Sequence, residues 1–296
     1  MNEQEFLIFF MEKIGFPEEA QEFFQGLHRQ ILKETEYNRR MDYIIKVFMD
    51  NQSEKAFEQA DLLAKDMNIH SYTMSMMLLL LSCKPLSELY YERNISEDIF
   101  WDTLADLTYK LNECRHIYGI WGTFVRTWFP PFYQTARFAL GRMQYEYSSF
   151  FLDEYSLNGV TLKKGDKVIN MHIPSSGSFS EKTRMDSYQR AYRFFEKDFP
   201  EKTVPIVCSS WLLYPGYRDI LPAHSNIRNF MDDFSYIKGY NRKEFTDSWR
   251  IFGKDAGKPP VDLPRDTSLQ KAFAEYLEKG GTPGVGYGIL FSTCSK

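Results

Sequence analysis

The chain has 296 residues and a formal net charge of −4 at pH 7, and this length suits two domains of ordinary size. Hydrophobic residues make up 43% of the chain and aromatic residues 17%, which provides for a large buried core and excludes intrinsic disorder. Because basic residues are not in excess, we expect neither a nucleic-acid partner nor a membrane partner.

Cysteine usage and the apolar runs narrow the class of protein further. The four cysteines are far apart and none forms a C-x-x-C pair, so the sequence predicts no zinc site, no redox dithiol and no metal cofactor. The acidic start of the chain argues against a signal peptide, and the most apolar run, Met74–Leu81, is too short to cross a bilayer. We therefore expect a reduced, cytoplasmic protein.

The chain up to about residue 128 predicts successive helices and carries no strand signal. Its apolar residues recur at intervals of three and four, as on the buried faces of amphipathic helices. The clearest helix is expected to start after Ser96 and to end at Gly119, with one continuous apolar face: Phe100, Leu104, Leu107, Leu111 and Cys114. Pro130 and Pro131 are expected to stop any helix. We therefore predict an all-helical domain over residues 1–130 and a second domain over residues 131–296.

Beyond the prolines, the spacing of apolar residues changes from a helical period to alternation. Three runs predict strands: Arg142–Tyr147, Ser149–Leu157 and Val168–Ile173. The turn sequences between the later runs are Asn158-Gly159 and Lys163–Asp166. An antiparallel meander is therefore expected to lead into the strand Val168–Ile173.

A strand–loop–helix–strand unit follows, ending on the strand Val204–Leu213. Its length suits a right-handed crossover between parallel strands. Ser178 and Glu181 fit a capping box, so the helix is expected to start at Ser178 and to bury one face: Met185, Tyr188, Tyr192, Phe195 and Phe199. The unpaired N–H groups of that helix start form an anion site, and Gly177 allows a ligand to approach the backbone. Alternatively, the serines of this loop only cap the helix.

The remainder of the chain predicts two more helices and two more strands. Ser225 is expected to cap a helix with an apolar face of Ile227, Phe230, Met231, Phe234 and Ile237. Trp249–Phe252 predicts a short strand, and a helix is expected to begin at Thr267 or Ser268 and to end at Gly280. The glycines on one face of the final strand, Val285–Phe291, mark either the approach of a ligand or the packing of a bulky neighbour. This order predicts an α+β fold with a mixed sheet.

With this order of elements, the chain resembles a bacterial two-domain family that joins an N-acyltransferase N-terminal domain to a GNAT-like C-terminal domain. The GNAT superfamily consists of acyl-CoA-dependent N-acyltransferases. Four stretches carry the resemblance: Ile95–Leu104, Leu140–Glu146, His172–Gly177 and Gly284–Leu290. The resemblance implies an all-helical N-terminal domain followed by a GNAT-like, mixed and mainly antiparallel sheet flanked by helices.

The resemblance also implies acetyl-CoA or another short acyl-CoA as co-substrate. In the superfamily, two parallel strands splay apart, the pantetheine arm bonds to the exposed strand edge, and the pyrophosphate lies on the loop and the helix start. Of the superfamily's loop pattern, Gln/Arg-x-x-Gly-x-Gly/Ala, only Gly177 matches, while Pro174 and Phe179 stand at the other two positions. The cofactor-binding residues that this resemblance implies are Ile173, Ser175, Ser176, Gly177, Ser178, Phe179 and Ser180.

Acylation of an amine needs a base, a place for the oxyanion and an acid for the leaving thiolate. His172 ends its strand next to the expected acyl position and is a candidate base, although it could instead only fix the loop. Glu146 is the alternative base, or a solvated carboxylate on a strand. Tyr214 and Tyr217 follow the second parallel strand, where superfamily members often place a tyrosine acid; the alternative is that they only pack.

The resemblance therefore predicts an acyl-CoA-dependent N-acyltransferase that acts on an amine of a small molecule or peptide. The alternative is a non-catalytic protein of GNAT shape that binds an acyl-CoA or a protein partner. Release of free thiol from acyl-CoA in the presence of amines distinguishes the two hypotheses.

Overall fold

The computed structural model describes residues 1–157, 159–175, 177–199 and 203–293. The chain divides into two compact units, Met1–Phe138 and Ala139–Lys296. The boundary that we expected from the sequence, between residues 130 and 131, lies within the first of these units.

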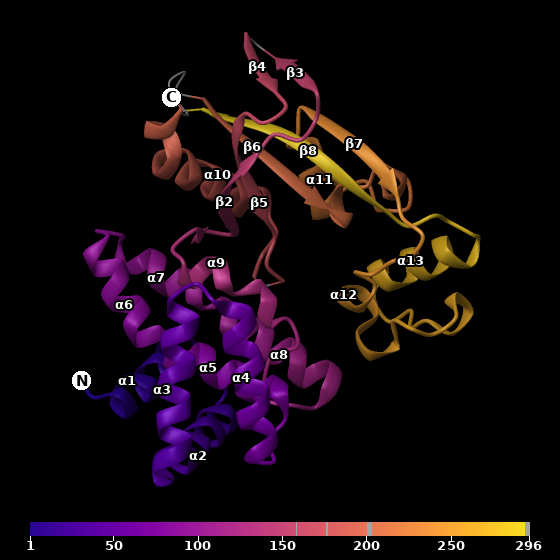
Figure 1. The fold of residues 1–296 in the computed structure, drawn as a ribbon. Helices are drawn as coiled ribbons and strands as arrows, with labels where there is room; N and C mark the ends of the chain where they lie inside the picture. Colours follow the sequence, from indigo (N-terminus) through magenta and orange to yellow (C-terminus); the bar gives the residue numbers. More distant parts are fainter. Residues whose placement is uncertain (158, 176, 200–202, 294–296) are drawn as a thin grey trace. The chain divides into compact units, whose positions relative to one another are not determined.

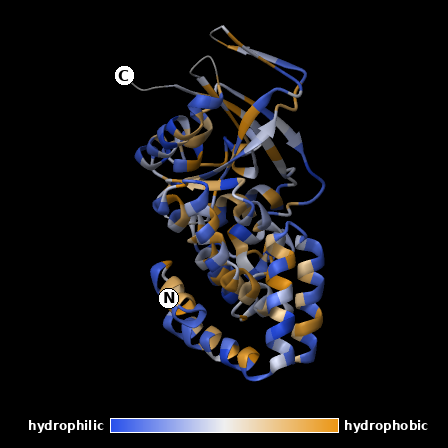
Figure 2. Ribbon diagram, turned by 60° about the vertical axis from the view of Figure 1, so that its left-hand side comes forward, coloured by the Kyte–Doolittle hydropathy of each residue, from blue (hydrophilic) through white to orange (hydrophobic). Residues whose placement is uncertain are grey.

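The first unit is built from helices (Figure 1). Figure 2 shows apolar residues along one side of many of them, as expected for amphipathic helices around a core. The most apolar helix, α5, is buried along almost its whole length. The helices are α1 Glu3–Lys13, α2 Glu18–Lys33, α3 Thr35–Met49, α4 Ser53–Asp66, α5 Ser71–Leu81, α6 Cys83–Glu92, α7 Glu97–Leu104, α8 Asp106–Tyr118 and α9 Pro130–Tyr133.

Two expectations for this unit are wrong in detail. The long helix between Ser96 and Gly119 is two helices, α7 and α8, which meet at Ala105. Its apolar face is buried throughout, so the spacing of apolar residues gave no sign of the break. Gly119 ends α8 in the left-handed conformation, as predicted. Pro130 and Pro131 do not end a helix but begin one, α9, because the first turn of a helix needs no N–H donor there.

The second unit contains a six-stranded sheet in the order β1-β2-β5-β6-β8-β7. β5 and β6 are parallel, whereas β2–β5, β6–β8 and β7–β8 are antiparallel, so the predicted mixed and mainly antiparallel sheet is confirmed. Four helices accompany it: α10 Glu181–Phe195, α11 Asn226–Asp232, α12 Trp249–Phe252 and α13 Ser268–Glu278. The strands of the sheet are β1 Arg137–Leu140, β2 Met143–Ser149, β5 Lys167–His172, β6 Thr203–Ser210, β7 Tyr236–Asn241 and β8 Gly284–Thr293.

The short elements of this unit differ most from the sequence-based expectations. Of the strand expected over Ser149–Leu157, only Glu154–Leu157 forms a strand, β3. It pairs with β4, Val160–Lys163, in a separate two-stranded sheet, and Asn158 of the expected turn lies outside the described residues. Ile237 belongs to an edge strand, β7, rather than to a helix face, and α12 is a helix where a strand was expected. Short apolar runs fit both periods, so tertiary packing decides between them.

The glycines of the last strand allow neighbouring groups to pack closely. A Cβ atom on Gly286 would lie 2.0 Å from the carbonyl oxygen of Leu213, and one on Gly288 would lie 2.4 Å from the ring of Phe234. A Cβ atom on Gly284 would lie 2.3 Å from the ring of Tyr214. Of the two readings of this glycine face, the structure therefore supports the packing of bulky neighbours.

Helix α10 buries a polar residue where an apolar one was expected. Tyr188, Tyr192 and Phe195 are buried as predicted, but Met185 is 39% exposed and the neighbouring Arg184 is 1% exposed. The guanidinium of Arg184 donates two hydrogen bonds to the carboxylate of Asp233, at 2.6 and 3.1 Å. Burial works against the charged guanidinium, yet the ion pair with Asp233 raises the pKa of Arg184 above its ordinary value. A buried cation is stable here because a carboxylate meets it.

We expect Arg184→Ala to lower the free energy of unfolding by about 3–5 kcal/mol, because it leaves the carboxylate of Asp233 buried without its cation. Arg190→Ala is the matched control, since Arg190 lies on the same helix and pairs with Asp186 at the exposed surface. That change is expected to cost less than about 1 kcal/mol. Urea unfolding followed by circular dichroism measures both, and equal losses would contradict the assignment.

Candidate functional site

Two neighbouring strands bring the two candidate bases into contact. In the register of β2 and β5, Gln144 lies opposite His172 and Glu146 lies opposite Asn170. His172 Nε2 lies 2.5 Å from Glu146 Oε1, and Asn170 Nδ2 donates to the same carboxylate oxygen at 3.3 Å. Asn170 Nδ2 and His172 Nε2 are 3.1 Å apart. The three side chains form one polar cluster, called the Glu146–His172 cluster below.

The alternation of strand residues puts this cluster on one face of the sheet. Tyr145, between Gln144 and Glu146, turns to the other face, where its hydroxyl contacts Ser187 Oγ of α10 at 2.9 Å. Glu146 and its cross-strand neighbours therefore lie on the face opposite α10. The side chains of His172 and Glu146 are 21% and 19% exposed, which leaves them accessible to a ligand and only partly screened by water.

The geometry favours one arrangement of protons in the cluster. Two donors, His172 Nε2–H and an amide N–H of Asn170, converge on Glu146 Oε1, which accounts for the close approach of the two nitrogens. In this tautomer, Nδ1 of His172 carries the lone pair that can accept a proton. Glu146 then stabilises the imidazolium that forms, so the pair is suited to general-base chemistry.

The parallel strands β5 and β6 diverge next to this cluster. Their ladder consists of Ile169 opposite Ile206 and Asn170 opposite Val207 within the described residues. β5 stays paired with β2 as far as His172, and β6 stays paired with β8 as far as Ser210. The carboxyl ends of β5 and β6 point apart in Figure 1. We call this feature the β5–β6 divergence; its facing backbone edges can hydrogen-bond an extended ligand.

The loop after β5 leads to the start of α10. The helix begins at Glu181 with Ser180 as its N-cap, and Ser180 Oγ accepts from the N–H of Thr183. The expected start at Ser178 is therefore wrong by a few residues, because Ser178 hydrogen-bonds within the loop instead. In the described part of the chain, the backbone N–H groups of Glu181 and Lys182 have no hydrogen-bond partner. Such groups at a helix start bind anions.

Gly177 has the conformation that the loop requires. Its φ is +68°, in the left-handed region, and no atom lies within 4 Å of a Cβ built on it. Space above the backbone is therefore open to a ligand. Ile173, Ser175, Ser178 and Phe179 lie along the same connection, whereas Ser176 lies outside the described residues.

Two arginines that sequence reasoning did not assign to the site hold this loop. Arg142 Nε donates to the carbonyl of Ser178 at 3.1 Å, and Arg184 Nη1 donates to the carbonyl of Phe179 at 3.0 Å. Their guanidinium groups lie 5.2 and 5.6 Å from the centre of the Phe179 ring. The charge of Arg142 strengthens the attraction of the helix start for anions, whereas the charge of Arg184 is met by Asp233. The sequence carried one sign of this role for Arg184. The helix dipole disfavours a cation in the first turn of a helix, so an arginine there indicates a specific partner.

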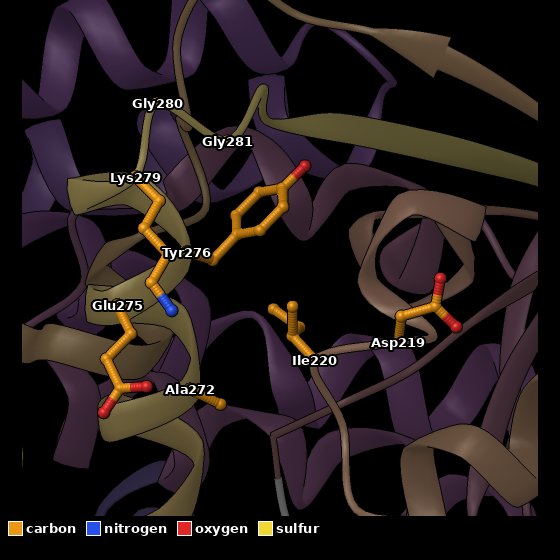
Figure 3. A pocket seen from close by; sticks show the side chains of 8 residues that line it. All are labelled: Asp219, Ile220, Ala272, Glu275, Tyr276, Lys279, Gly280 and Gly281. Atoms are coloured by element: carbon orange, nitrogen blue, oxygen red, sulfur yellow. The ribbon is translucent and has the colours of Figure 1, made fainter.

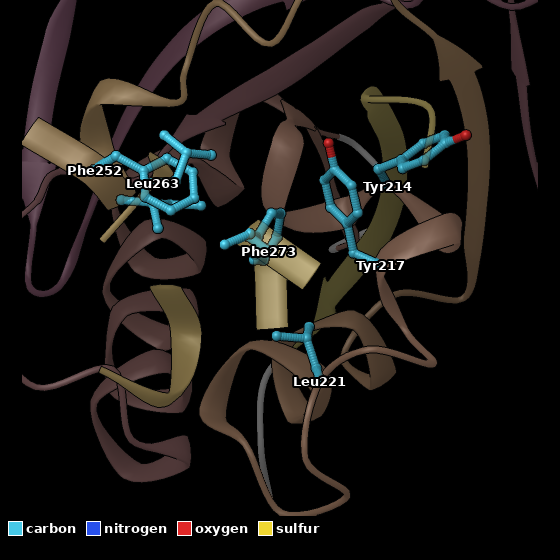
Figure 4. Packing of buried hydrophobic residues seen from close by; sticks show 8 residues of the cluster. Tyr214, Tyr217, Leu221, Phe252, Leu263 and Phe273 are labelled. Carbon is cyan, nitrogen blue, oxygen red and sulfur yellow. The ribbon is translucent and has the colours of Figure 1, made fainter. Parts of the chain in front are cut away.

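Tyr214 and Tyr217 lie in a different part of the unit. They belong to an aromatic cluster with Phe252, Leu263 and Phe273 (Figure 4). The Tyr214 hydroxyl donates to Asn241 Oδ1 at 2.6 Å, and the Tyr217 hydroxyl accepts from the N–H of Gly284 at 3.0 Å. Burial raises the pKa of Tyr217 to about 12. Their role as acids stays a prediction, and both hydroxyls already have partners.

Two cavities of about 430 Å³ each border the aromatic cluster. The first lies between α13 and the segment Asp219–Ile220, and Figure 3 shows Tyr276 and Lys279 of the helix across from Asp219. The second lies at the end of β6 and is lined by Trp211, Gly284, Val285 and the segment Arg242–Asp247.

The described residues hold neither a metal-ligand cluster nor a membrane-spanning helix, and their cysteines are buried. No three or more His, Cys, Asp or Glu side chains gather there as metal ligands would. No helix in the described ranges has the length and hydropathy to cross a bilayer. Cys83, Cys114 and Cys208 are buried free thiols, and Cys294 lies outside the described ranges.

Comparison with known proteins identifies related folds. The model of an N-acyltransferase N-terminal domain matches residues 5–135, and the model of a GNAT-like C-terminal domain matches residues 138–290. Among proteins of curated function, none matches this sequence.

Solved acyltransferases share the fold over almost the whole chain. One, in complex with decanoyl-CoA and teicoplanin, is 20% identical, with 95% of this chain and 86% of that chain covered at a TM-score of 0.71. A mutant acyltransferase in complex with octanoyl-CoA is 20% identical, with 95% and 85% covered at a TM-score of 0.70. A third, in complex with CoA and 10C-teicoplanin, is 19% identical, with 95% and 86% covered at a TM-score of 0.70.

Proposed function

Since the chain belongs to the family that joins an N-acyltransferase N-terminal domain to a GNAT-like C-terminal domain, we propose that it transfers an acyl group from an acyl-CoA thioester to an amine. The observation that carries this proposal is the Glu146–His172 cluster beside the β5–β6 divergence. A base thus stands where an extended thioester arm would end.

The reaction follows from the roles of these groups. His172 Nδ1 takes a proton from the ammonium form of the acceptor, and Glu146 stabilises the imidazolium. The neutral amine attacks the thioester carbon, and backbone N–H groups at the divergence stabilise the oxyanion. The intermediate collapses to an amide as its nitrogen gives up its second proton, and the thiolate of coenzyme A leaves and takes up one proton. Tyr214 and Tyr217 are the acids that the resemblance implies, but Tyr214 packs on the glycine face of β8, opposite the face that holds the Glu146–His172 cluster, so it is not proposed for this step.

The loop and the start of α10 are proposed to hold the phosphates of the donor. The N–H groups of Glu181 and Lys182, which have no partner within the described residues, and the cation of Arg142 favour an anion there. Gly177 leaves the backbone open for its approach.

The donors and acceptors to test follow from the family and from its solved neighbours. The resemblance implies acetyl-CoA or another short acyl-CoA, whereas solved acyltransferases of this fold hold octanoyl-CoA and decanoyl-CoA. The donor series should therefore run from acetyl-CoA to decanoyl-CoA. Teicoplanin, which one of those structures holds, belongs among the acceptors with small amines and peptides.

The residues of the loop after β5 favour testing the non-catalytic alternative as well. Pro174 and Phe179 replace the superfamily's usual loop residues, and such a loop could bind a ligand without turnover. If acyl-CoA raises the melting temperature and no donor–acceptor pair releases thiol, the chain is a binding protein.

Two substitutions test the proposed base. His172→Ala is expected to lower kcat/KM for acyl transfer by about 10²–10⁴-fold, the usual contribution of a general base. Glu146→Gln keeps the shape but removes the charge that stabilises the imidazolium, so a loss of about 10²-fold or more is expected. Release of coenzyme A thiol measures both, and His224→Ala, at an exposed loop histidine, is the control. Full activity in both variants would refute the base assignment.

Stabilisation by an acyl-CoA tests the proposed donor loop. Acyl-CoA at a hundred times its dissociation constant should add about 2.7 kcal/mol of stability, a rise in melting temperature of about 5–10 °C. Gly177→Val is expected to abolish most of this rise, because valine strains a backbone with positive φ and fills the open space.

Gly165→Val is the matched control for that change. Gly165 also has a positive φ, +94°, with no atom within 4 Å of an added Cβ, but it lies in the turn before β5. Both variants should melt at lower temperature than the wild type without ligand. Only Gly177→Val should lose the ligand-induced rise, and an equal loss in both would place the donor elsewhere.

A further inference from the structure

The cavity at the carboxyl end of β6 is lined by both charged and aromatic side chains. Its lining comes from three segments: Trp211 after β6, residues 242–247 after β7, and Gly284 and Val285 at the start of β8. Its volume, about 430 Å³, suits a small ligand or the end of a larger one.

Two cations and two carboxylates line this cavity. Arg242 and Lys243 are exposed, and within the described residues neither forms an ion pair. Of the two lining carboxylates, Asp247 is already paired with Arg250 at 2.9 Å, which leaves Glu244 against two cations. A guanidinium and an ammonium at one opening favour a carboxylate ligand, which arginine can bind through two parallel hydrogen bonds.

Part of the lining is aromatic and held in place by packing. The rings of Trp211 and Phe245 are 5.8 Å apart at an interplanar angle of 63°. Phe245 stacks on Phe273 at 5.7 Å, and Trp211 meets the edge of Phe273 at 5.6 Å. This part of the lining is thus anchored on the aromatic cluster, so an apolar side chain of a ligand would find a preorganised surface.

Strand register puts this cavity at the same end of the sheet as the proposed base, and one of its lining side chains, Val285, turns to the face of that base. Val285 alternates with the glycines that pack on Leu213 and Tyr214, so its side chain faces the other way, with Tyr287. Tyr287 packs with Val168 of β5, two residues before Asn170, on the face of the Glu146–His172 cluster. β5 and β6 are parallel, so Trp211 and His172 both follow carboxyl ends of strands.

We propose that this cavity is the acceptor subsite, and that it recognises an amine acceptor carrying a carboxylate next to an aromatic or apolar side chain, as at the end of a short peptide. The inference rests on the proposed function, because it names the acceptor class for the same reaction. The phosphates of the donor have their own anion site at the start of α10, which leaves Arg242 and Lys243 for the acceptor.

The test compares dipeptides that differ either in the charge of the carboxyl end or in the side chain beside it. Glycyl-phenylalanine and glycyl-phenylalaninamide share the same amine-bearing residue, and glycyl-alanine removes the ring. Titration calorimetry of the full chain measures binding of each peptide, and thiol release from octanoyl-CoA measures transfer. We expect the free acid to bind about tenfold more tightly than the amide, with a preference that falls as salt rises. Glycyl-alanine should bind more weakly than glycyl-phenylalanine.

The double change Arg242→Gln/Lys243→Gln should reduce the acid-to-amide preference to about one. Lys271→Gln, which removes an exposed cation of α13 outside the cavity, should keep it. The proposal is overturned if the double variant retains the preference, if neither peptide binds, or if the double variant loses coenzyme A binding while its peptide preference persists.

The outcomes also separate this proposal from the proposed function. Preference for the acid that depends on Arg242 and Lys243, without thiol release for any peptide, supports the anion-binding cavity and refutes acyl transfer to this class. Thiol release with equal kcat/KM for the acid and the amide supports acyl transfer and refutes the cavity as a carboxylate subsite.

Discussion

The second unit is organised around the position at which the hydrogen-bond ladder between β5 and β6 ends. Backbone N–H and C=O groups inside a fold need partners, so two central strands cannot separate without support. Here each strand keeps its other neighbour: β2 pairs with β5 as far as His172, and β8 pairs with β6 as far as Ser210. The outer ladders hold the strands while the facing edges open after Asn170 and Val207. The facing strand edges therefore open beside the Glu146–His172 cluster, where the base is proposed.

Helix α10 and its loop are fixed by buried charge. Burying Arg184 is unfavourable by itself, and it is compensated by Asp233, which also accepts a hydrogen bond from the Tyr188 hydroxyl at 2.8 Å. The same guanidinium reaches the carbonyl of Phe179, so one residue anchors the helix and shapes the loop before it. A cation in the first turn opposes the helix dipole, and the carboxylate of Asp233 offsets that charge.

The alternation of β8 gives its two faces different neighbours. Its glycine face allows Leu213, Tyr214 and Phe234 to approach the strand backbone more closely than any larger residue would permit. Its other face carries Val285 and Tyr287 toward the side of the sheet that holds the Glu146–His172 cluster. The aromatic cluster built on the glycine side then supports Trp211 and Phe245, which line the cavity at the end of β6.

The sequence by itself determined the features that depend on a few adjacent residues. Gly119 ends α8 and Ser225 caps α11, both as predicted, because a left-handed residue or a capping hydroxyl acts within one turn. The order strand–loop–helix–strand and the α+β class also followed from the sequence, since the period of apolar residues changes clearly at the start of the second unit. The secondary structure of the short apolar runs could not be predicted from the sequence. Packing against β8 determines β7, and packing in the aromatic cluster determines α12.

For the site, the sequence identified His172 and Glu146 separately, each as a candidate base with a structural alternative. Only the register between β2 and β5 brings them within 2.5 Å across 26 residues of chain and adds Asn170 to the pair. Arg142 reaches the carbonyl of Ser178 across 36 residues of chain, and Arg184, five residues from Phe179, is held in place by Asp233, 49 residues further along. Residue types and local spacing fix which chemistry is available. Pairing between distant segments decides which groups meet, because that choice minimises the free energy of the whole sheet and its core rather than of any one segment.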